Sequence, residues 1–175
     1  MKLIIGLGNP GLKFQGTKHN AGALLLKKWM ADQDVSGLKI SKKLRSLISE
    51  SANLIIGLPQ VFMNESGQAV KKISGFFRIE PKNILIVHDD SDLNVGEYKL
   101  QFNRGSAGHN GINSIINHLG TKNFWRLRIG IRVNNPAKRL KAEEFVLKKF
   151  SHSELEIIEK SIPEISKLIN EWIKG

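Results

Sequence analysis

The sequence predicts a single-domain α/β protein: a three-layer sandwich in which a twisted, mostly parallel but mixed sheet carries helices on both faces. Three observations predict this class. The 175 residues suffice for one domain with a substantial core, and we assign residues 1–175 to that domain. Short apolar runs alternate along the chain with segments of helical periodicity. No repeat, low-complexity tract or linker interrupts the alternation.

The first half of the chain predicts three strands and two helices. Residues 3–7 form a short apolar run that is typical of a buried strand, and residues 21–30 have the apolar spacing of a helix. Residues 46–48 and 54–58 predict two strands, close enough in sequence to form a hairpin. A helix is expected over residues 68–77, because its apolar side chains recur on one side.

The second half predicts strands at 84–87, 97–102 and 124–133, and a helix over 112–119. Gly120 follows that helix, at the position where glycine commonly ends one.

A final helix is predicted to start at a capping box. Ser151 and Glu154 have the required spacing, and an apolar stripe follows them. Pro163 lies within that stripe, so we expect it to kink or divide the helix. The stripe consists of Leu155, Ile158, Ile162, Ile165, Ile169 and Trp172.

The segment GLGNPG, residues 6–11, has the glycine spacing of a dinucleotide-binding turn. Such a site also needs a helix that opens on these glycines and an acidic residue at the end of a second strand. Here the proline and glycines resist helix formation until about Asn20, and Asp32 and Asp34 fall at the tail of a helical pattern. The context therefore disfavours an NAD site, and the loop that ends at His19 and Asn20 is expected to serve another purpose.

Composition restricts the chemistry further. The chain has no cysteine, which excludes disulfides, thiolate metal ligands and a cysteine nucleophile, and suits a reducing cytoplasm. No secretory signal or membrane span is visible, so we expect a cytoplasmic protein without a membrane partner. The net charge of +11 favours a polyanionic partner. A lysine-rich, solvated surface accounts for that charge equally well.

Polar segments follow several predicted strands, and parallel strands would bring them together at one edge of the sheet. The side chains that would converge are His19, Asp89, His109, Asn9, Asn64 and Asn110. A histidine held by an aspartate is a general-base pair. No serine elbow is present, so the base would activate water, which suits a reactive bond such as an ester. Asparagine amides would orient a carbonyl or hold an oxyanion.

Each of these residues also has a simpler interpretation. Asn64 and Asn110 would cap the helices that they precede. A divalent metal is a second alternative, but no segment has a zinc-site spacing, and we expect neither a metal nor another cofactor. The ligands in that alternative would be His88, Asp89, Asp90 and Asp92 with His19. Phe14, Phe62 and Phe102 would offer ring faces to a nucleotide or belong to the core.

Positive charge is patterned on the strand at 124–133. Arg126, Arg128 and Arg132 alternate with apolar residues and would share one face, where they would suit a phosphate backbone or simply face solvent. Lys99 and Arg104 precede a predicted helix N-terminus and add to the positive charge there.

Taken together and in order, these segments resemble bacterial peptidyl-tRNA hydrolases over nearly the whole chain. The matching motifs are GLGNPG followed by TKHNAG, then FMNESG, HDDSDL, GSAGHNG, RLRIGI and FVLKKFS. The resemblance implies a monomeric α/β esterase that cuts the ester between the peptide and the terminal ribose of peptidyl-tRNA without a metal.

The resemblance also implies roles for individual residues. His19 would activate water, Asp89 would hold His19, and Asn9 would distinguish N-blocked from free aminoacyl-tRNA. The substrate and the tRNA would be bound by Phe14, Phe62, Met63, Asn64, His109, Asn110, Lys99, Arg104 and Arg128.

Three positions depart from the family pattern. Phe14 stands where the family often has tyrosine, HDDSD stands for HDELD, and GSAGHNG has one glycine fewer than GSAGGHNG.

Overall fold

The computed structural model describes residues 1–35, 37–133 and 145–175. Within these residues, seven strands form one sheet in the order β2-β3-β4-β1-β5-β7-β6. The strands are β1 (Lys2–Gly6), β2 (Lys39–Ser41), β3 (Ser46–Glu50), β4 (Leu54–Pro59), β5 (Ile84–Asn94), β6 (Tyr98–Phe102) and β7 (Trp125–Arg132).

The centre of the sheet is parallel and its edges are antiparallel. β1 pairs in parallel with β4 and β5, and β5 pairs in parallel with β7. The antiparallel pairs are β2 with β3, β3 with β4, and β6 with β7. The mixed, mostly parallel sheet predicted from the sequence is therefore confirmed, and so is the hairpin at β3 and β4. β1 and the first half of β5 are apolar on both faces, as central strands covered by helices must be.

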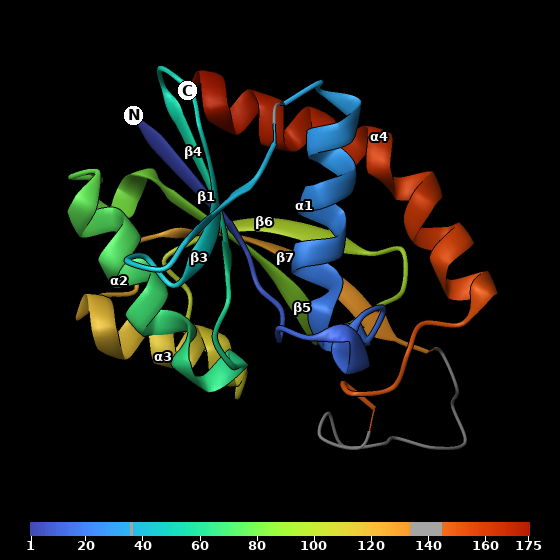
Figure 1. Ribbon diagram of the computed structural model, residues 1–175. Helices are drawn as coiled ribbons and strands as arrows, with labels where there is room; N and C mark the ends of the chain where they lie inside the picture. Colours follow the sequence, from blue (N-terminus) through green and yellow to red (C-terminus); the bar gives the residue numbers. More distant parts are fainter. Residues whose placement is uncertain (36, 134–144) are drawn as a thin grey trace.

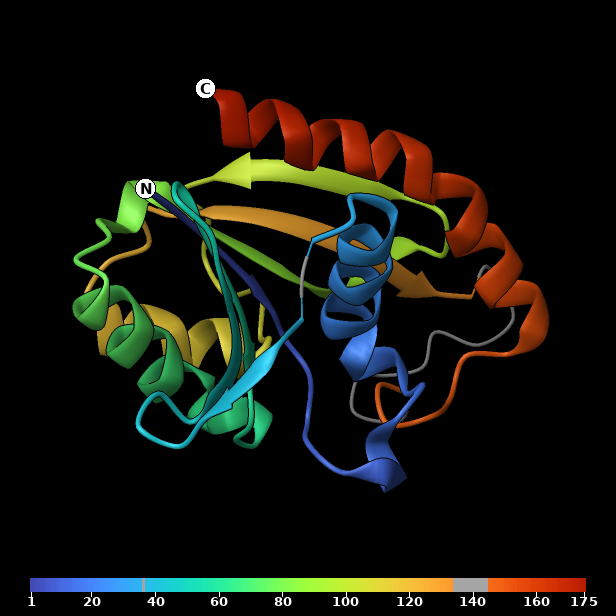
Figure 2. The ribbon, with the colours of Figure 1, turned by 45° about the horizontal axis from the view of Figure 1, so that its top comes forward.

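Helices cover both faces of the sheet, which confirms the three-layer sandwich (Figure 1). α1 (Ala21–Asp32) and α4 (His152–Lys174) lie on one face, and α2 (Ser66–Phe76) and α3 (Asn110–Leu119) lie on the other (Figures 1 and 2). Each layer has its own core. Leu25, Trp29 and Ile165 belong to the α1/α4 core, whereas Val70 and Ile112 belong to the α2/α3 core.

The ends of α3 and α4 form as the sequence predicts. Gly120 ends α3 in the left-handed conformation, with φ of 70°. The Ser151 side chain accepts a hydrogen bond from the Glu154 backbone N–H, and the Glu154 side chain completes the capping box. Of the two outcomes expected at Pro163, a kink or a division, the division is wrong, because α4 runs on through this residue as one helix, which Figure 2 shows to be curved.

The structure corrects the sequence prediction in the middle of the chain. The polar residues 88–92, expected in a loop after the strand, lie inside β5. They stay in the strand because β5 pairs with β7 up to Asp90 opposite Gly130, and again at Asn94 opposite Arg132. The edge strand β2 was not predicted; its side chains are exposed or half-buried, so no apolar alternation marks it. α2 begins at Ser66, two residues before its predicted start.

The glycine-rich turn after β1 does not open a helix. Short 3₁₀ turns, η1 (Leu12–Phe14) and η2 (Lys18–Asn20), separate it from α1, so the dinucleotide alternative is wrong. Gly22 serves packing instead: a Cβ atom there would fall on the backbone carbonyl of Val87 in β5. The glycine lets the start of α1 lie directly on the sheet, and the start of α1 follows His19 in the chain.

No helix among the described residues is long and apolar enough to cross a membrane.

Candidate active site

The site is centred on a histidine and an aspartate that come from distant parts of the chain. Nδ1 of His19, in η2, lies 2.9 Å from Oδ1 and 3.0 Å from Oδ2 of Asp89, in β5. Both side chains are nearly buried. Because Nδ1 donates its hydrogen to the carboxylate, the lone pair of the neutral ring is on Nε2. Nε2 has no protein partner in the described part of the chain, so it is available to take a proton.

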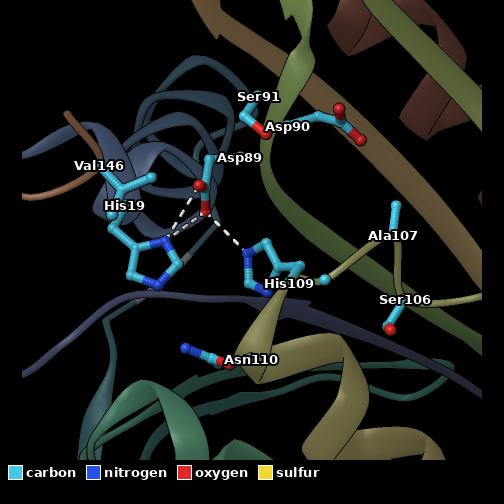
Figure 3. Close-up of a pocket in the computed structure, with 10 residues that line it drawn as sticks. His19, Asp89, Asp90, Ser91, Ser106, Ala107, His109, Asn110 and Val146 are labelled. Atoms are coloured by element: carbon cyan, nitrogen blue, oxygen red, sulfur yellow. Dashed lines mark hydrogen bonds and ion pairs between the residues drawn. The ribbon is translucent and has the colours of Figure 1, made fainter. Parts of the chain in front are cut away.

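His109 completes the group and at the same time caps α3. Its Nδ1 accepts hydrogen bonds from the backbone N–H groups of Gly111, at 3.0 Å, and Ile112, at 3.3 Å. Its Nε2 lies 2.9 Å from Oδ1 of Asp89. An Nδ1 that accepts from backbone amides has no hydrogen, so we assign the hydrogen of the neutral ring to Nε2, which donates it to Asp89. Figure 3 shows the two imidazole rings converging on the carboxylate.

The two rings keep Asp89 ionised. Burial alone would raise its pKa, but the electrostatic attraction of His109 and the hydrogen bonds from His109 and His19 outweigh burial and hold the pKa of Asp89 far below its usual value. A permanent carboxylate at this point supports the positive charge that His19 acquires when it takes a proton.

The ligand atoms of His19, Asp89 and His109 also lie within 4.8 Å of one another, which is close enough to surround a metal ion. The hydrogen bonds favour protons instead. A metal on Nε2 of His109 would displace its hydrogen while Nδ1 still accepts from two amides, which would leave an imidazolate. The site is therefore better suited to general-base chemistry than to metal binding.

The metal-ligand set considered from the sequence is not assembled. Nδ1 of His88 lies 2.6 Å from the backbone oxygen of Asp89. Asp90 forms an ion pair with Arg128, at 2.6 Å between Oδ2 and Nε, and Asp92 is exposed. Successive residues of a strand point to opposite faces, so Asp89 does not share a face with His88, Asp90 and Asp92, and the five side chains of this set do not surround one ion.

A cavity of about 270 Å³ opens beside the His19–Asp89 pair. Its lining includes His19, Asp89, His109 and Asn110, which were predicted for the general-base site, and Asp90, which was considered only as a metal ligand. The other lining residues are Ser91, Ser106, Ala107, Gly108 and Val146, none of which was predicted to belong to the site. Figure 3 shows Asn110 beyond the two imidazole rings as seen from Asp89.

Asn110 and Asn64 do not act as the helix caps considered above. The N-cap of α3 is His109, and Asn110 is the first residue of the helix. The N-cap of α2 is Glu65, which makes no side-chain capping bond, and Asn64 lies exposed in the preceding turn η3 (Met63–Glu65). Both amides are thus left for other partners.

Asn9 and its neighbours form a second group of predicted residues. The Asn9 side-chain oxygen accepts a hydrogen bond of 2.8 Å from the Met63 backbone N–H. Met63 is buried, and its sulfur atom packs against Gly111 at the start of α3. Phe14 and Phe62 meet edge to face, with ring centroids 6.3 Å apart, and Phe62 is 53% exposed. The fold thus brings these predicted residues together and connects them to the start of α3.

The turn that carries His19 is held by the segment 145–150. The His19 N–H donates to the Val146 carbonyl at 2.8 Å, and the Lys18 N–H donates to the Lys148 carbonyl at 3.0 Å. The Lys18 ammonium forms a nearly buried ion pair with Glu154 of α4. These anchors could not be predicted from the sequence, because their partners are far away in the chain.

The arginines of β7 are not an exposed row. Arg126 is only 2% exposed and donates to the Gly105 carbonyl; burial, together with Arg128 and Arg104, lowers its pKa to about 10. Arg128 is occupied by Asp90 and by Gln101, at 2.7 Å. Neither a phosphate-binding nor a solvent-facing role fits Arg126, because its side chain is buried and its guanidinium binds the Gly105 carbonyl. Lys99 and Arg104 are exposed.

An imidazole–carboxylate pair beside a cavity, on an α/β sheet covered by helices, is an arrangement suited to an enzyme that uses a general base. Comparison with known proteins identifies its family. Residues 3–175 match the family model described as peptidyl-tRNA hydrolase. The chain belongs to this family.

Similar proteins span nearly the same length. A peptidyl-tRNA hydrolase of Mycoplasma capricolum is 39% identical over 174 residues, covering 98% of this chain and 92% of its own. One of Corynebacterium efficiens is 37% identical over 172 residues, covering 98% and 96%. The crystal structure of the enzyme from Acinetobacter baumannii matches with a TM-score of 0.90 at 33% identity, covering 100% of this chain and 89% of its own.

Proposed function

We propose that this chain hydrolyses the ester bond between the peptide and the tRNA in peptidyl-tRNA, and so returns tRNA to translation. Family membership supports the substrate. The observation that carries the chemistry is the orientation of His19, whose Nδ1 is bound to both oxygens of Asp89 while Nε2 has no protein partner.

In this mechanism Nε2 of His19 removes a proton from water, and the water oxygen attacks the acyl carbon of the ester. The imidazolium that forms is stabilised by the Asp89 carboxylate. The bond from the acyl carbon to the ribose oxygen then breaks, and the imidazolium returns its proton to that oxygen. The products are a peptide carboxylic acid, which releases its remaining proton to the solvent, and a tRNA with a free ribose hydroxyl.

The remaining predicted residues bind the substrate in this proposal. Asn110 lines the cavity next to His109 and would contact the groups around the scissile ester, and Asn64 would do so from η3. Asn9 has its side-chain oxygen bound to Met63 and would use its amide hydrogens to recognise the blocked amino end. Phe14, Phe62 and Met63 would supply the apolar rim.

For the phosphates of the tRNA, we assign Lys99 and Arg104, which are exposed, a more direct role than Arg128, whose guanidinium already binds Asp90 and Gln101. We also infer that the protein acts as a monomer in the cytoplasm, without a protein partner. A single species of about 20 kDa in solution would support the monomer.

The proposal is tested by incubating the purified protein with N-acetylated and with free aminoacyl-tRNA, each with and without EDTA. We expect cleavage of the blocked substrate, little cleavage of the free one, and no effect of the chelator. Loss of activity with EDTA would favour a metal-dependent hydrolase. Salt-sensitive tRNA binding without ester cleavage would indicate a non-catalytic RNA-binding protein.

A further inference from the structure

We propose that Asn20, the residue after the proposed base, is a positioning residue that orients Asn9 and thereby sets the selectivity for substrates with a blocked amino group. The inference rests on the proposed function. The geometry that carries it is a pair of hydrogen bonds between the Asn20 side chain and the backbone of Asn9: the Asn9 N–H donates to Asn20 Oδ1 at 2.8 Å, and Asn20 Nδ2 donates to the Asn9 carbonyl at 2.9 Å.

This pair leaves Asn9 little freedom. Its backbone N–H and carbonyl are both bound to Asn20, and its side-chain oxygen accepts from the Met63 N–H at 2.8 Å. Because a backbone N–H can only donate, the atom that faces Met63 must be the oxygen of the Asn9 amide. The Asn9 NH₂ group has no hydrogen-bond partner within residues 1–35, 37–133 and 145–175, and it is therefore presented as a donor.

A fixed donor distinguishes the two substrate types. An N-acylated amino acid has an additional carbonyl oxygen, which accepts a hydrogen bond from an NH₂ group. A free aminoacyl ester has an ammonium group instead, which only donates and cannot bind the Asn9 NH₂. The discrimination depends on the direction in which Asn9 presents its amide, and Asn20 holds the backbone from which that amide extends.

The local structure is fitted to an asparagine at position 20. Gly8 leaves the space that its side chain occupies, since a Cβ atom on Gly8 would lie 3.0 Å from the Asn20 Cγ. Asparagine offers one acceptor and two donors on a short side chain, whereas aspartate offers acceptors only. The Asn20 backbone N–H donates to the Thr17 carbonyl at 2.9 Å, and the His19 N–H donates to Val146. One short turn therefore places both the base and the residue that orients the selective amide.

The test compares Asn20→Asp with the wild type and with Asn53→Asp, a matched control in the exposed turn before β4. In Asn20→Asp the acceptor for the Asn9 N–H is kept, but a second carboxylate oxygen faces the Asn9 carbonyl. We measure kcat/KM for N-acetylated and free aminoacyl-tRNA across a pH series. The kcat/KM value for the N-acetylated substrate divided by that for the free substrate should fall by about tenfold or more in Asn20→Asp. The same ratio should stay unchanged in Asn53→Asp.

A second comparison separates positioning from general damage. In an Asn9→Ala background the selective amide is gone, so Asn20→Asp should change kcat/KM by less than about twofold. The pH–rate profile of Asn20→Asp should coincide with that of the wild type, since the substitution leaves the His19–Asp89 pair in place. If Asn20→Asp does not fold, Asn20→Ala, which removes both bonds without adding a charge, takes its place.

The outcomes distinguish the two proposals. If the wild type does not cleave blocked aminoacyl-tRNA, the proposed function fails and this inference fails with it. If the wild type cleaves but the Asn20 variant retains its selectivity, or loses as much activity in the Asn9→Ala background, the positioning role alone is wrong.

Discussion

The same carboxylate oxygen of Asp89 that lies 2.9 Å from Nδ1 of His19 also lies 2.9 Å from Nε2 of His109. Since the other nitrogen of His109 accepts from the first amides of α3, the helix fixes the His109 tautomer, and His109 in turn helps to fix the carboxylate that orients His19. The general-base pair is thus connected to the α2/α3 layer of the sandwich as well as to the turn before α1.

Asp89→Asn should reduce turnover by ~10²-fold or more, because a neutral amide cannot stabilise the imidazolium and its NH₂ group would stand where Oδ2 now meets Nδ1 of His19. Circular dichroism should show an intact fold. The control is Asp92→Asn, which changes an exposed residue close by in β5 and should leave the rate unchanged. A pH–rate profile of Asp89→Asn that matches the wild type would argue against the pairing.

His19→Ala should lower kcat by ~10²-fold or more, as the loss of a general base usually does. Single-turnover hydrolysis of N-acetylated aminoacyl-tRNA measures the effect. His152→Ala is the matched control, because the His152 side chain is 91% exposed on α4. Near-normal turnover by His19→Ala would refute the role of the base.

Stability should fall on acidification because of His88, which is buried beside His109 and Arg126. Burial lowers the pKa of His88 well below its usual value, and His109 and Arg126 lower it further. Below about pH 6.5 this histidine is protonated in the unfolded chain but not in the folded one. The free energy of unfolding is therefore not reduced by His88 above that pH, and it decreases as the pH falls below it.

Thermal unfolding between about pH 7.5 and 5 checks this expectation. The melting temperature of the wild type should fall more steeply with decreasing pH than that of His88→Asn. His152→Asn should keep the wild-type slope, since that side chain is exposed. Equal slopes for wild type and His88→Asn would show that His88 titrates normally.

Replacing either of two glycines with alanine should change the stability of the fold, but in opposite directions. Gly22→Ala places a methyl group on the Val87 carbonyl and should destabilise the fold by about 2 kcal/mol or more, and it should also impair activity because α1 follows His19. Gly75→Ala, on an exposed position of α2 with no atom within 4 Å of the added methyl group, should stabilise by about 0.5–1 kcal/mol. Urea denaturation measures both, and equal effects would contradict the packing argument.

Lys18→Met should destabilise the protein by about 3 kcal/mol, because it leaves the Glu154 carboxylate without its nearly buried partner. Adding Glu154→Gln should recover part of the loss, since the amide oxygen can still accept from the Ser151 N–H in the capping box. If the double variant unfolds at the same urea concentration as Lys18→Met, or at a lower one, the broken ion pair is not the cause of the lost stability.

The elements that the sequence predicted well are those whose own residues determine them. β1 and the first half of β5 are apolar on both faces, and α4 has its capping box and stripe within a short stretch. The end of β5 was missed because its residues are polar. They remain in a strand only because β7 supplies their backbone hydrogen bonds and Arg128 neutralises Asp90.

The site, too, could be predicted only as far as its own residues determine it. The resemblance identified His19 and Asp89, and the sheet topology confirms that they meet. Neither the spacing nor the motifs revealed that His109 caps α3, that Asn20 binds Asn9, or that Arg126 is buried and bound to the Gly105 carbonyl. Each of these depends on which remote backbone group comes within hydrogen-bonding distance, and this is decided by tertiary packing.

The contact between segment 145–150 and the turn at 16–19 has a consequence for the order in which the protein matures. Thr17 bridges Lys149, and the Phe150 N–H donates to the Gly16 carbonyl. During synthesis the N-terminal part of a chain emerges first. The turn that bears the imidazole therefore gains these supports only after residues 145–150 have been synthesised, so the surroundings of His19 are completed much later than His19 itself.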